Sequence, residues 1–401
     1  MISFDNTEIA FRSKSNKDLR RAFWLFKIIG SPTIVKIGKA VTNFFLAIRF
    51  PMAWAIKPTI FKQFCGGETI PECDKTINTL GSFNVGTILD YSVEGKINDE
   101  DFNQTVEVIL DTIKRAKKDK NIPFAVFKVS GIGRFDLLEK ASNKNHQLSE
   151  KENKELAVIN SRIGKICQAA HDCQVSVFID AEESWIQDII DRWANEQMIK
   201  FNYSLPIVYN TLQMYRHDRM NYLREMLLFA KENKIIYAAK IVRGAYMEKE
   251  RARAATKAYP SPIQVDKNAT DRDYDEALNF MVSNKSHFAL CAGTHNEESS
   301  LKLSQLLKKN GIPANDTRFY FSQLLGMSDH ISYNLANAGY NVAKYVPFGP
   351  IREVMPYLLR RADENTSVAG QTGRELSLIT KERKRRKMLA GKIITQNNKN
   401  D

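Results

Sequence analysis

The chain has 401 residues, 43% of them hydrophobic and 26% charged, which is typical of a globular protein with one large domain or two of ordinary size. The most apolar candidate for a membrane-spanning helix, residues 44–56, is interrupted by Arg49 and Pro51, so we expect no such helix. The first residues lack a secretory signal, and five scattered cysteines indicate a reducing compartment without a disulfide framework.

Residues 1–84 are predicted to form a helical N-terminal extension that packs onto the rest of the chain. This region contains several aromatic residues together with Pro32, Pro51 and Pro58, in a pattern unlike the one that follows it. The aromatic residues include Trp24, Phe26, Phe44, Phe45 and Trp54.

From about residue 85 onward, short β-rich runs alternate with longer amphipathic ones. The runs predicted to be strands are residues 85–93, 124–130, 175–180, 207–211, 237–243, 288–292, 318–323 and 343–348. Most are apolar nearly throughout, as parallel strands buried on both faces should be. Eight strand–helix units predict a (β/α)8 TIM-like barrel over residues 85–370, because an open doubly wound sheet rarely needs eight parallel strands.

The helices between these runs have recognisable end signals. Ser149 and Glu152 form a capping box before an apolar helical stripe. Thr270 is predicted to cap the helix that precedes the sixth strand, and Asn296 the helix that follows it. Two lysines followed by Gly311 end the latter helix, as the helix dipole favours.

Residues 371–401 are predicted to form a basic C-terminal helix or tail that carries much of the net charge of +13. A solvated tail or terminal helix is the favoured interpretation of this charge, and we expect no nucleic-acid partner. An anionic lipid surface stays open as an alternative.

A barrel enzyme carries its active site at the carboxyl ends of its strands. The polar residues that this rule selects are Lys128, Asp180, Asn210, Arg243, Thr294, His295 and Tyr345. Each has an ordinary interpretation as well. A lysine such as Lys128 most often buries its stem and exposes its ammonium group, although it can also be a Schiff-base nucleophile or an anion clamp. A single aspartate such as Asp180 most often caps the next helix.

Two further groups of residues can serve a large anionic ligand. After Lys240 and Arg243 come Gly244 and Ala245, whose small side chains allow close approach of a ligand to the backbone. Arg360 and Arg361 follow the last strand. Arg361 flanks an apolar helical stripe and Arg360 points nearly opposite, so a solvated face is the ordinary interpretation.

Several familiar sites are not indicated. His287, Cys291 and His295 recur every four residues, but a strand places such residues on one face, and we expect no metal site. Gly131 and Gly133 lack the third glycine of a Rossmann fingerprint. A nucleophile elbow, a P-loop and a zincin motif are also missing from the sequence.

Six segments closely resemble the motifs of proline dehydrogenases, in the same order and at the same spacing. They are KIVRGAY at 240–246, FIDAE at 178–182, GTHN at 293–296, FSQLLGM at 321–327, YVPFG at 345–349 and YLLRRADEN at 357–365. Lys240 followed by Arg243, where many bacterial members have arginine followed by lysine, resembles the eukaryotic-type monofunctional enzymes, as does VYNT at 208–211.

The resemblance implies that the chain binds FAD without a Rossmann domain. Arg243, Gly244 and Ala245 would line the phosphate and ribityl region, with Thr294 and His295 beside the adenosine. The remaining roles follow the same resemblance: Asn210 at the isoalloxazine edge, Lys240 near the reactive nitrogen, Asp180 supporting the cations, Tyr345 against the pyrrolidine ring, and Lys128, Arg360 and Arg361 on the carboxylate.

The implied reaction is oxidation of L-proline to Δ1-pyrroline-5-carboxylate, with a hydride passing to flavin N5. The electrons would then go to a quinone. The expected location is cytoplasmic, with peripheral contact to an inner membrane through the basic tail or the aromatic N-terminal segment. A separate pyrroline-5-carboxylate dehydrogenase would consume the product.

Three alternatives stay open. A hydroxyproline dehydrogenase would share the fold and cofactor, although the bulk of Tyr345 argues against it. A barrel lyase would use Lys128 or Lys240 as a Schiff-base amine. A basic binding protein would have no flavin and would bind polyanions with a steep salt dependence.

Overall fold

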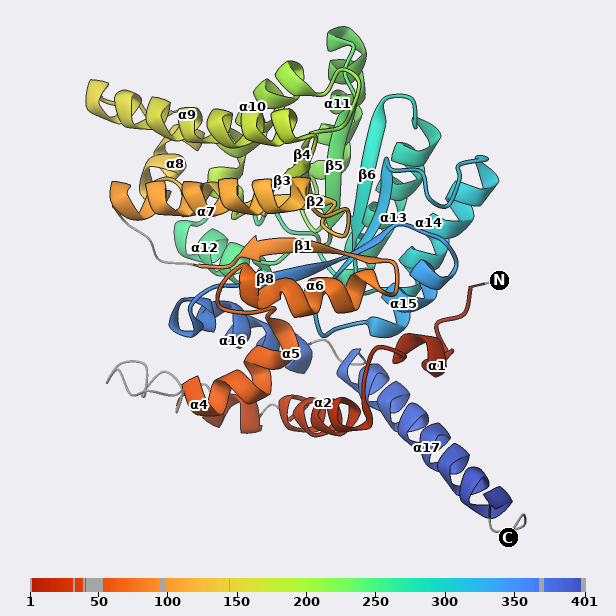
Figure 1. Cartoon of the computed structure of the whole chain (residues 1–401). Helices are drawn as coiled ribbons and strands as arrows, with labels where there is room; N and C mark the ends of the chain where they lie inside the picture. Colours follow the sequence, from red (N-terminus) through yellow and green to blue (C-terminus); the bar gives the residue numbers. More distant parts are fainter. Residues whose placement is uncertain are drawn as a thin grey trace.

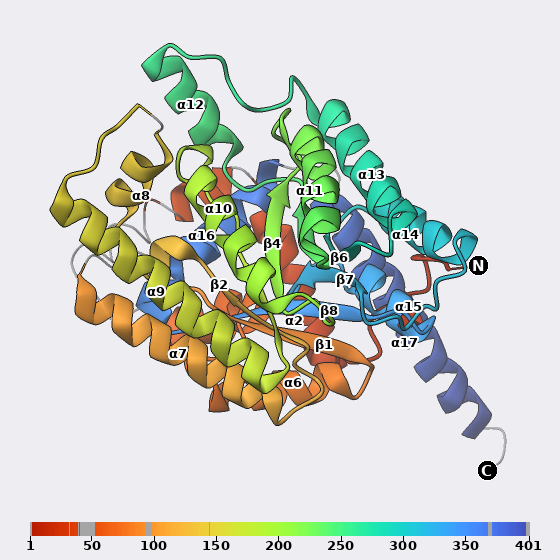
Figure 2. The same ribbon diagram turned by 90° about the horizontal axis from the view of Figure 1, so that it is seen from above.

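The computed structural model describes residues 2–31, 33–38, 40, 53–93, 98–143, 145–367 and 371–397. Within them, eight parallel strands pair in the order β1 to β8 and close into a barrel, with helices wrapped around it (Figures 1 and 2). The last strand pairs with the first over seven residues, from Val85 opposite Val342 to Tyr91 opposite Phe348. The predicted (β/α)8 fold is therefore confirmed.

The eight strands overlap the eight predicted runs. They are β1 (Val85–Tyr91), β2 (Phe124–Phe127), β3 (Ser176–Ile179), β4 (Val208–Gln213), β5 (Tyr237–Val242), β6 (Phe288–Gly293), β7 (Phe319–Leu324) and β8 (Val342–Phe348). The run predicted at 124–130 is too long, because the chain leaves the sheet at Lys128 and makes a short 3-10 turn over Val129–Gly131.

The outer helices are α7 (Asp99–Lys117), α8 (Phe135–Ser142), α9 (Glu150–Cys173), α10 (Ser184–Phe201), α11 (Arg219–Asn233), α12 (Met247–Lys257), α13 (Lys267–Ser283), α14 (Glu297–Lys309), α15 (Asp329–Asn337) and α16 (Ile351–Ser367). The capping box at Ser149 and the cap at Asn296 are confirmed. The predicted cap at Thr270 is wrong. The carboxylate of Asp266, on an extended backbone four residues earlier, caps α13 instead.

Aromatic rings fill the barrel interior below the carboxyl ends of the strands. Phe124 stacks on Phe178 with ring centroids 4.4 Å apart, and Tyr209 meets both rings edge to face. The three side chains are buried. Because the interior is packed in this way, polar chemistry is confined to the carboxyl-end mouth of the barrel.

The terminal segments pack against the α15–α16 side of the barrel. They contain α1 (Thr7–Ala10), α2 (Asn16–Ile29), α4 (Ala53–Ile56), η1 (Lys57–Phe61), α5 (Lys62–Phe64), η2 (Pro71–Cys73), α6 (Asp74–Gly81) and α17 (Gln371–Asn397). Phe26 of α2, Leu358 of α16 and Leu378 of α17 belong to one apolar cluster. Figure 1 shows α17 running past α2 and then away from the body of the protein.

The basic C-terminal region is a helix, and its first half differs from a solvated tail. Leu378 and Ile379 are buried, and so are the acidic residues Glu375 and Glu382. None of the helices in the described part of the chain combines the length and the apolar character needed to cross a bilayer. Residues 41–52, which include most of the apolar run noted at 44–56, lie outside the described residues.

Candidate active site

Lys240 of β5 stands at the centre of the polar cluster in the barrel mouth. Its ammonium group is 2.5 Å from Oδ1 of Asp180, which follows β3, and it also donates a hydrogen bond to the hydroxyl of Tyr345 in β8. The Tyr345 hydroxyl lies 3.3 Å from the same Asp180 oxygen. The structure thus joins three predicted site residues from three strands. Asp180 does not cap α10, whose N-cap position is Glu183.

The rings around Lys240 add to this environment. The ammonium group lies 4.4 Å from the ring centroid of Tyr345 and 5.2 Å from that of Phe178. Burial and the neighbouring Asp180 raise the pKa of Tyr345 well above its ordinary value, so this phenol keeps its proton. The cluster is therefore a shielded ion pair covered by a neutral phenol.

Asp90, at the end of β1, is a buried carboxylate that the sequence-based prediction missed. Ser92 donates a hydrogen bond of 2.5 Å to Asp90 Oδ2. Burial raises the pKa of Asp90, and the positive charges of Lys128 and Lys240 act in the opposite direction. The alternation of β1, with Ile88 in the barrel interior, could have indicated that Asp90 faces the mouth.

Of the three cations predicted for a carboxylate, Lys128 lies at this end of the barrel, and the charges of Arg360 and Arg361 act on Tyr246 and His295 there. Lys128 follows β2 directly, and its charge acts on Asp90 and on Glu182. Burial raises the pKa of Tyr246, and the positive charges of Lys128 and Arg360 act in the opposite direction. Arg361 is buried, so the solvated-face interpretation is wrong for this residue.

A polar chain links the loops that follow β2, β3, β4 and β5. Ser130 donates through its amide and its hydroxyl to the two carboxylate oxygens of Glu182. Gln213 donates to the Glu182 carbonyl at 2.7 Å and accepts from the amide of Ala245 at 3.0 Å. Gly244, at φ +142°, lies directly against the Tyr215 ring, where a side chain would clash. These hydrogen bonds fix the backbone next to Lys128 and at Ala245.

Asn210 does not join the cluster. Its amide donates to Asp191 of α10 at 2.9 Å, on the outer face of β4, whereas Tyr209 points into the barrel. Strand alternation then places Gln213 on the inner side. The polar β4 side chain at the mouth is therefore Gln213, which the prediction missed. The predicted strand ended at Thr211, and continuing its alternation for two more residues would have placed Gln213 on the inner side.

Arg243, after β5, forms a second site beside the N-terminus of α14. Its guanidinium donates to the Thr294 hydroxyl at 2.7 Å and to Ser299 Oγ at 3.0 Å, and it pairs with Asp271 at 2.5 Å. Ser299 Oγ donates in turn to Asp275, so the donors suited to phosphate here are the guanidinium, the Thr294 hydroxyl and the helix N-terminus.

His295 continues this second site. Its Nδ1 is 2.9 Å from the Ser328 hydroxyl. Burial, together with the positive charges of Lys344 and Arg361, lowers the pKa of His295 to about 3, so the ring is neutral at physiological pH. Within the described residues its Nε2 has no hydrogen-bond partner, which leaves one ring nitrogen for a ligand.

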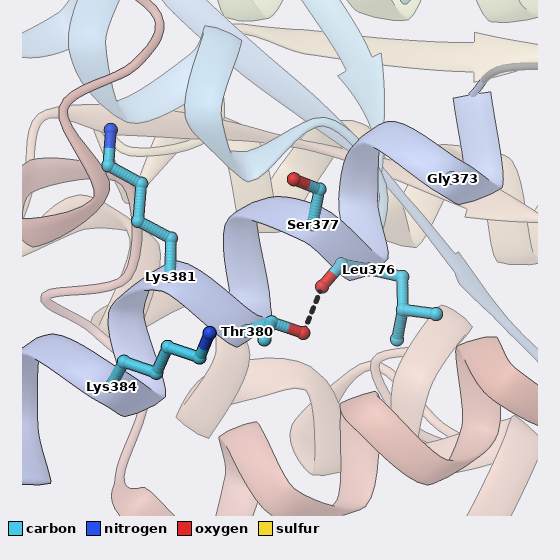
Figure 3. A pocket seen from close by; sticks show the side chains of 6 residues that line it. All are labelled: Gly373, Leu376, Ser377, Thr380, Lys381 and Lys384. Carbon is cyan, nitrogen blue, oxygen red and sulfur yellow. Dashed lines mark hydrogen bonds between the residues drawn. The ribbon is translucent and has the colours of Figure 1, made fainter.

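A hollow of about 530 Å³ occurs elsewhere, on α17 (Figure 3). Its lining residues are Gly373, Leu376, Ser377, Thr380, Lys381 and Lys384. Lys381 donates to the carbonyl of Asp5, and Thr380 to the carbonyl of Leu376. All of its lining residues belong to one helix outside the barrel, so it is not part of the candidate active site.

The buried Glu182 makes a testable contribution to pH-dependent stability. Burial raises its pKa to about 7. Between its ordinary value and about 7, the folded state binds more protons than the unfolded state, so rising pH lowers the free energy of unfolding. Glu182→Gln removes this titration. We therefore expect the free energy of unfolding of the variant, relative to that of wild type, to rise by on the order of 2–3 kcal/mol between pH 4.5 and pH 8. Thermal unfolding of both proteins at several pH values measures the gain, and a pH-independent difference would contradict it.

A family model for proline dehydrogenase matches residues 73–374. Proline dehydrogenase 1, mitochondrial, from Dictyostelium discoideum is 33% identical over 426 residues, covering 95% of this chain and 74% of that protein. Hydroxyproline dehydrogenase from Xenopus laevis is 30% identical, covering 96% and 90%. Among solved structures, proline utilization A from Bdellovibrio bacteriovorus matches with a TM-score of 0.71 at 18% identity. That match covers 90% of this chain but 38% of the other, and it shows the fold alone.

Proposed function

Because this chain belongs to the proline dehydrogenase family, we propose that it oxidises L-proline to Δ1-pyrroline-5-carboxylate with FAD as its cofactor. The observation that carries the proposal is the set of cations at one end of the barrel. Lys240 and Asp180 form a shielded pair in the mouth, Lys128 follows β2 at the same end, and we assign Arg360 and Arg361 of α16 to the same carboxylate. Such a set suits a small zwitterion whose carboxylate must be held in a fixed orientation.

The residues present fit FAD. Arg243 and Thr294 beside the N-terminus of α14 supply donors for the diphosphate, with Gly244 and Ala245 nearby and His295 next to the adenosine. Lys240 and Gln213 are the polar groups available to the isoalloxazine, with Gln213 in the place first assigned to Asn210. When bound, FAD accepts a hydride from the substrate carbon next to the amine.

The protein's own groups bind and orient the substrate. Lys128, Arg360 and Arg361 would hold the carboxylate, and the ring of Tyr345 would pack against the pyrrolidine ring. Asp180 keeps Lys240 in place through their short ion pair. The aromatic interior below them excludes water from the reacting face.

Hydroxyproline is the second substrate to compare, since one relative is named hydroxyproline dehydrogenase. The Tyr345 hydroxyl is already bound to Lys240 and Asp180, and its side chain is 7% exposed. A ring hydroxyl on the substrate would meet this occupied position, so we expect a preference for L-proline.

The visible spectrum of the purified protein, before and after anaerobic addition of each amino acid, tests the proposal. Flavin bands that bleach with L-proline at lower concentration than with 4-hydroxyproline are the expected result. A yellow protein that bleaches only with hydroxyproline would reassign the substrate. A colourless protein that cannot be reconstituted with FAD would overturn the proposed function and return attention to Schiff-base chemistry at Lys128 or Lys240.

The electron acceptor in this proposal is a membrane quinone, reached through peripheral contact with an anionic bilayer. The N-terminal helices expose large apolar side chains, with Trp24 at 53%, Ile37 at 60% and Trp54 at 76%. Lys17 and Arg20 flank Trp24 on the exposed face of α2. The Dictyostelium relative is named mitochondrial, and the cytoplasmic location stays a prediction, as does the separate enzyme that consumes the product.

We expect the double variant Trp24→Ala, Trp54→Ala to weaken binding to anionic vesicles by about tenfold, because each indole contributes interfacial area. Co-sedimentation at low salt measures the partition coefficient. Tyr203→Ala, which removes a 60% exposed aromatic after α10, is the matched control and should bind as wild type does. Equal binding by the double variant and wild type would reject this surface as the docking face.

A further inference from the structure

The loop between β7 and α15 is held by segments from both ends of the chain. Gln63 of α5 donates to the carbonyl of Gly326 at 2.9 Å. The carboxylate of Glu375 in α17 accepts a hydrogen bond from the backbone amide of Ser328. Distant parts of the sequence therefore fix a loop at the carboxyl end of the barrel.

Ser328 links α17 to the barrel mouth through hydrogen bonds. Its backbone has a φ of +51°, a left-handed conformation that is unfavourable for serine without compensating contacts. Its amide is bound by Glu375 and its hydroxyl is 2.9 Å from His295 Nδ1. A continuous hydrogen-bonded path thus runs from α17 to the end of β6.

A second set of contacts fixes α17 relative to the neighbouring helices. Arg374 pairs with Glu297, the first residue of α14, at 2.7 Å, and Glu297 also lies 3.1 Å from His330 of α15. Glu375 and His330 are each 3% exposed. The first turn of α17 therefore contacts α14 through Arg374, and it contacts α15 through Glu375, which lies 3.9 Å from His330 Nδ1.

From this geometry we propose that α17 is part of the cofactor site, and that Glu375 is a positioning residue for FAD. Glu375 holds Ser328, Ser328 orients the neutral ring of His295, and His295 presents its second nitrogen to the adenosine part of the cofactor. This inference rests on the proposed function, because it takes His295 to lie next to the adenosine. Its consequence is that FAD affinity depends on a helix outside the barrel.

Titration of the apoprotein with FAD, followed by quenching of flavin fluorescence, tests the inference without reference to turnover. Glu375→Ala removes the acceptor for the Ser328 amide, and we expect the Kd for FAD to rise about tenfold. Glu375→Gln keeps a carbonyl oxygen at the same place and should restore most of the affinity. Glu382→Ala is the matched control. Glu382 is equally buried in α17 but bonds Arg385 and Arg386 of its own helix, so its loss should leave the Kd within about twofold.

An unchanged Kd in Glu375→Ala, or an equal loss in Glu382→Ala, would overturn the inference. If Glu375→Ala does not fold, Ser328→Ala, which removes only the hydroxyl bound to His295, tests the same path, and a wild-type Kd in that variant would also reject it. Failure of the wild-type apoprotein to bind FAD at all would instead remove the proposed function, so the two failures are distinguishable.

Discussion

Lys240→Met is expected to abolish nearly all oxidation of L-proline and to destabilise the fold. The substitution keeps the length of the side chain but leaves Asp180, 13% exposed, without the ammonium group 2.5 Å away. Removing one partner of a buried ion pair costs about 3–5 kcal/mol. Loss of a charge placed at a reacting centre typically lowers kcat by about 10²–10³-fold. Thermal unfolding and the rate of anaerobic flavin bleaching with L-proline measure the two effects.

Lys249→Met is the control for Lys240→Met. Lys249 also pairs with an acidic residue, Glu183 at 3.0 Å, but its side chain is 66% exposed. We expect a stability change under about 1 kcal/mol and unchanged bleaching. If both variants behaved alike, or if Lys240→Met kept wild-type bleaching, the shielded pair would have no role in the reaction.

Arg361→Met is expected to raise the KM for L-proline by about 10²-fold, because a charge-assisted contact to the substrate carboxylate is lost. The effect should disappear with pyrrolidine, which is the same ring without a carboxylate. Steady-state kinetics with both amines therefore separate loss of carboxylate binding from general damage to the site.

Arg352→Met serves as the control for Arg361→Met, because Arg352 lies on the same helix but is exposed. It should leave the KM for L-proline as it is in wild type. An Arg361→Met enzyme that lost activity on L-proline and pyrrolidine equally would show that Arg361 supports the structure rather than the substrate.

The barrel was predictable because its strands are read from a local pattern. Eight apolar runs separated by amphipathic helices leave few other arrangements, and the strand-end rule then selects Asp180 and Tyr345 without any contact information. Lys240 was selected through the resemblance of residues 240–246 to a family motif. These three residues do meet in the structure.

The wrong and missed predictions depend on features that the local sequence does not determine. Asn210 and Gln213 lie on the same strand, and one residue of register decides which of them faces the barrel interior. Asp266 and Thr270 both suit a helix cap, and the backbone conformation decides between them. The buried face of α17, with Glu375 and Glu382, depends on contacts with Ser328 and the N-terminal segment, which no local pattern contains.

The stacked rings of Phe124, Phe178 and Tyr209 also bear on the order of events in a catalytic cycle. They close the barrel from below, so everything that reaches the reacting groups must arrive and depart through the same opening. In the proposed reaction, L-proline and the electron acceptor would use the same opening, so one must leave before the other binds. Such alternation predicts parallel lines in double-reciprocal kinetics, and it makes a slowly departing product an inhibitor of both half-reactions.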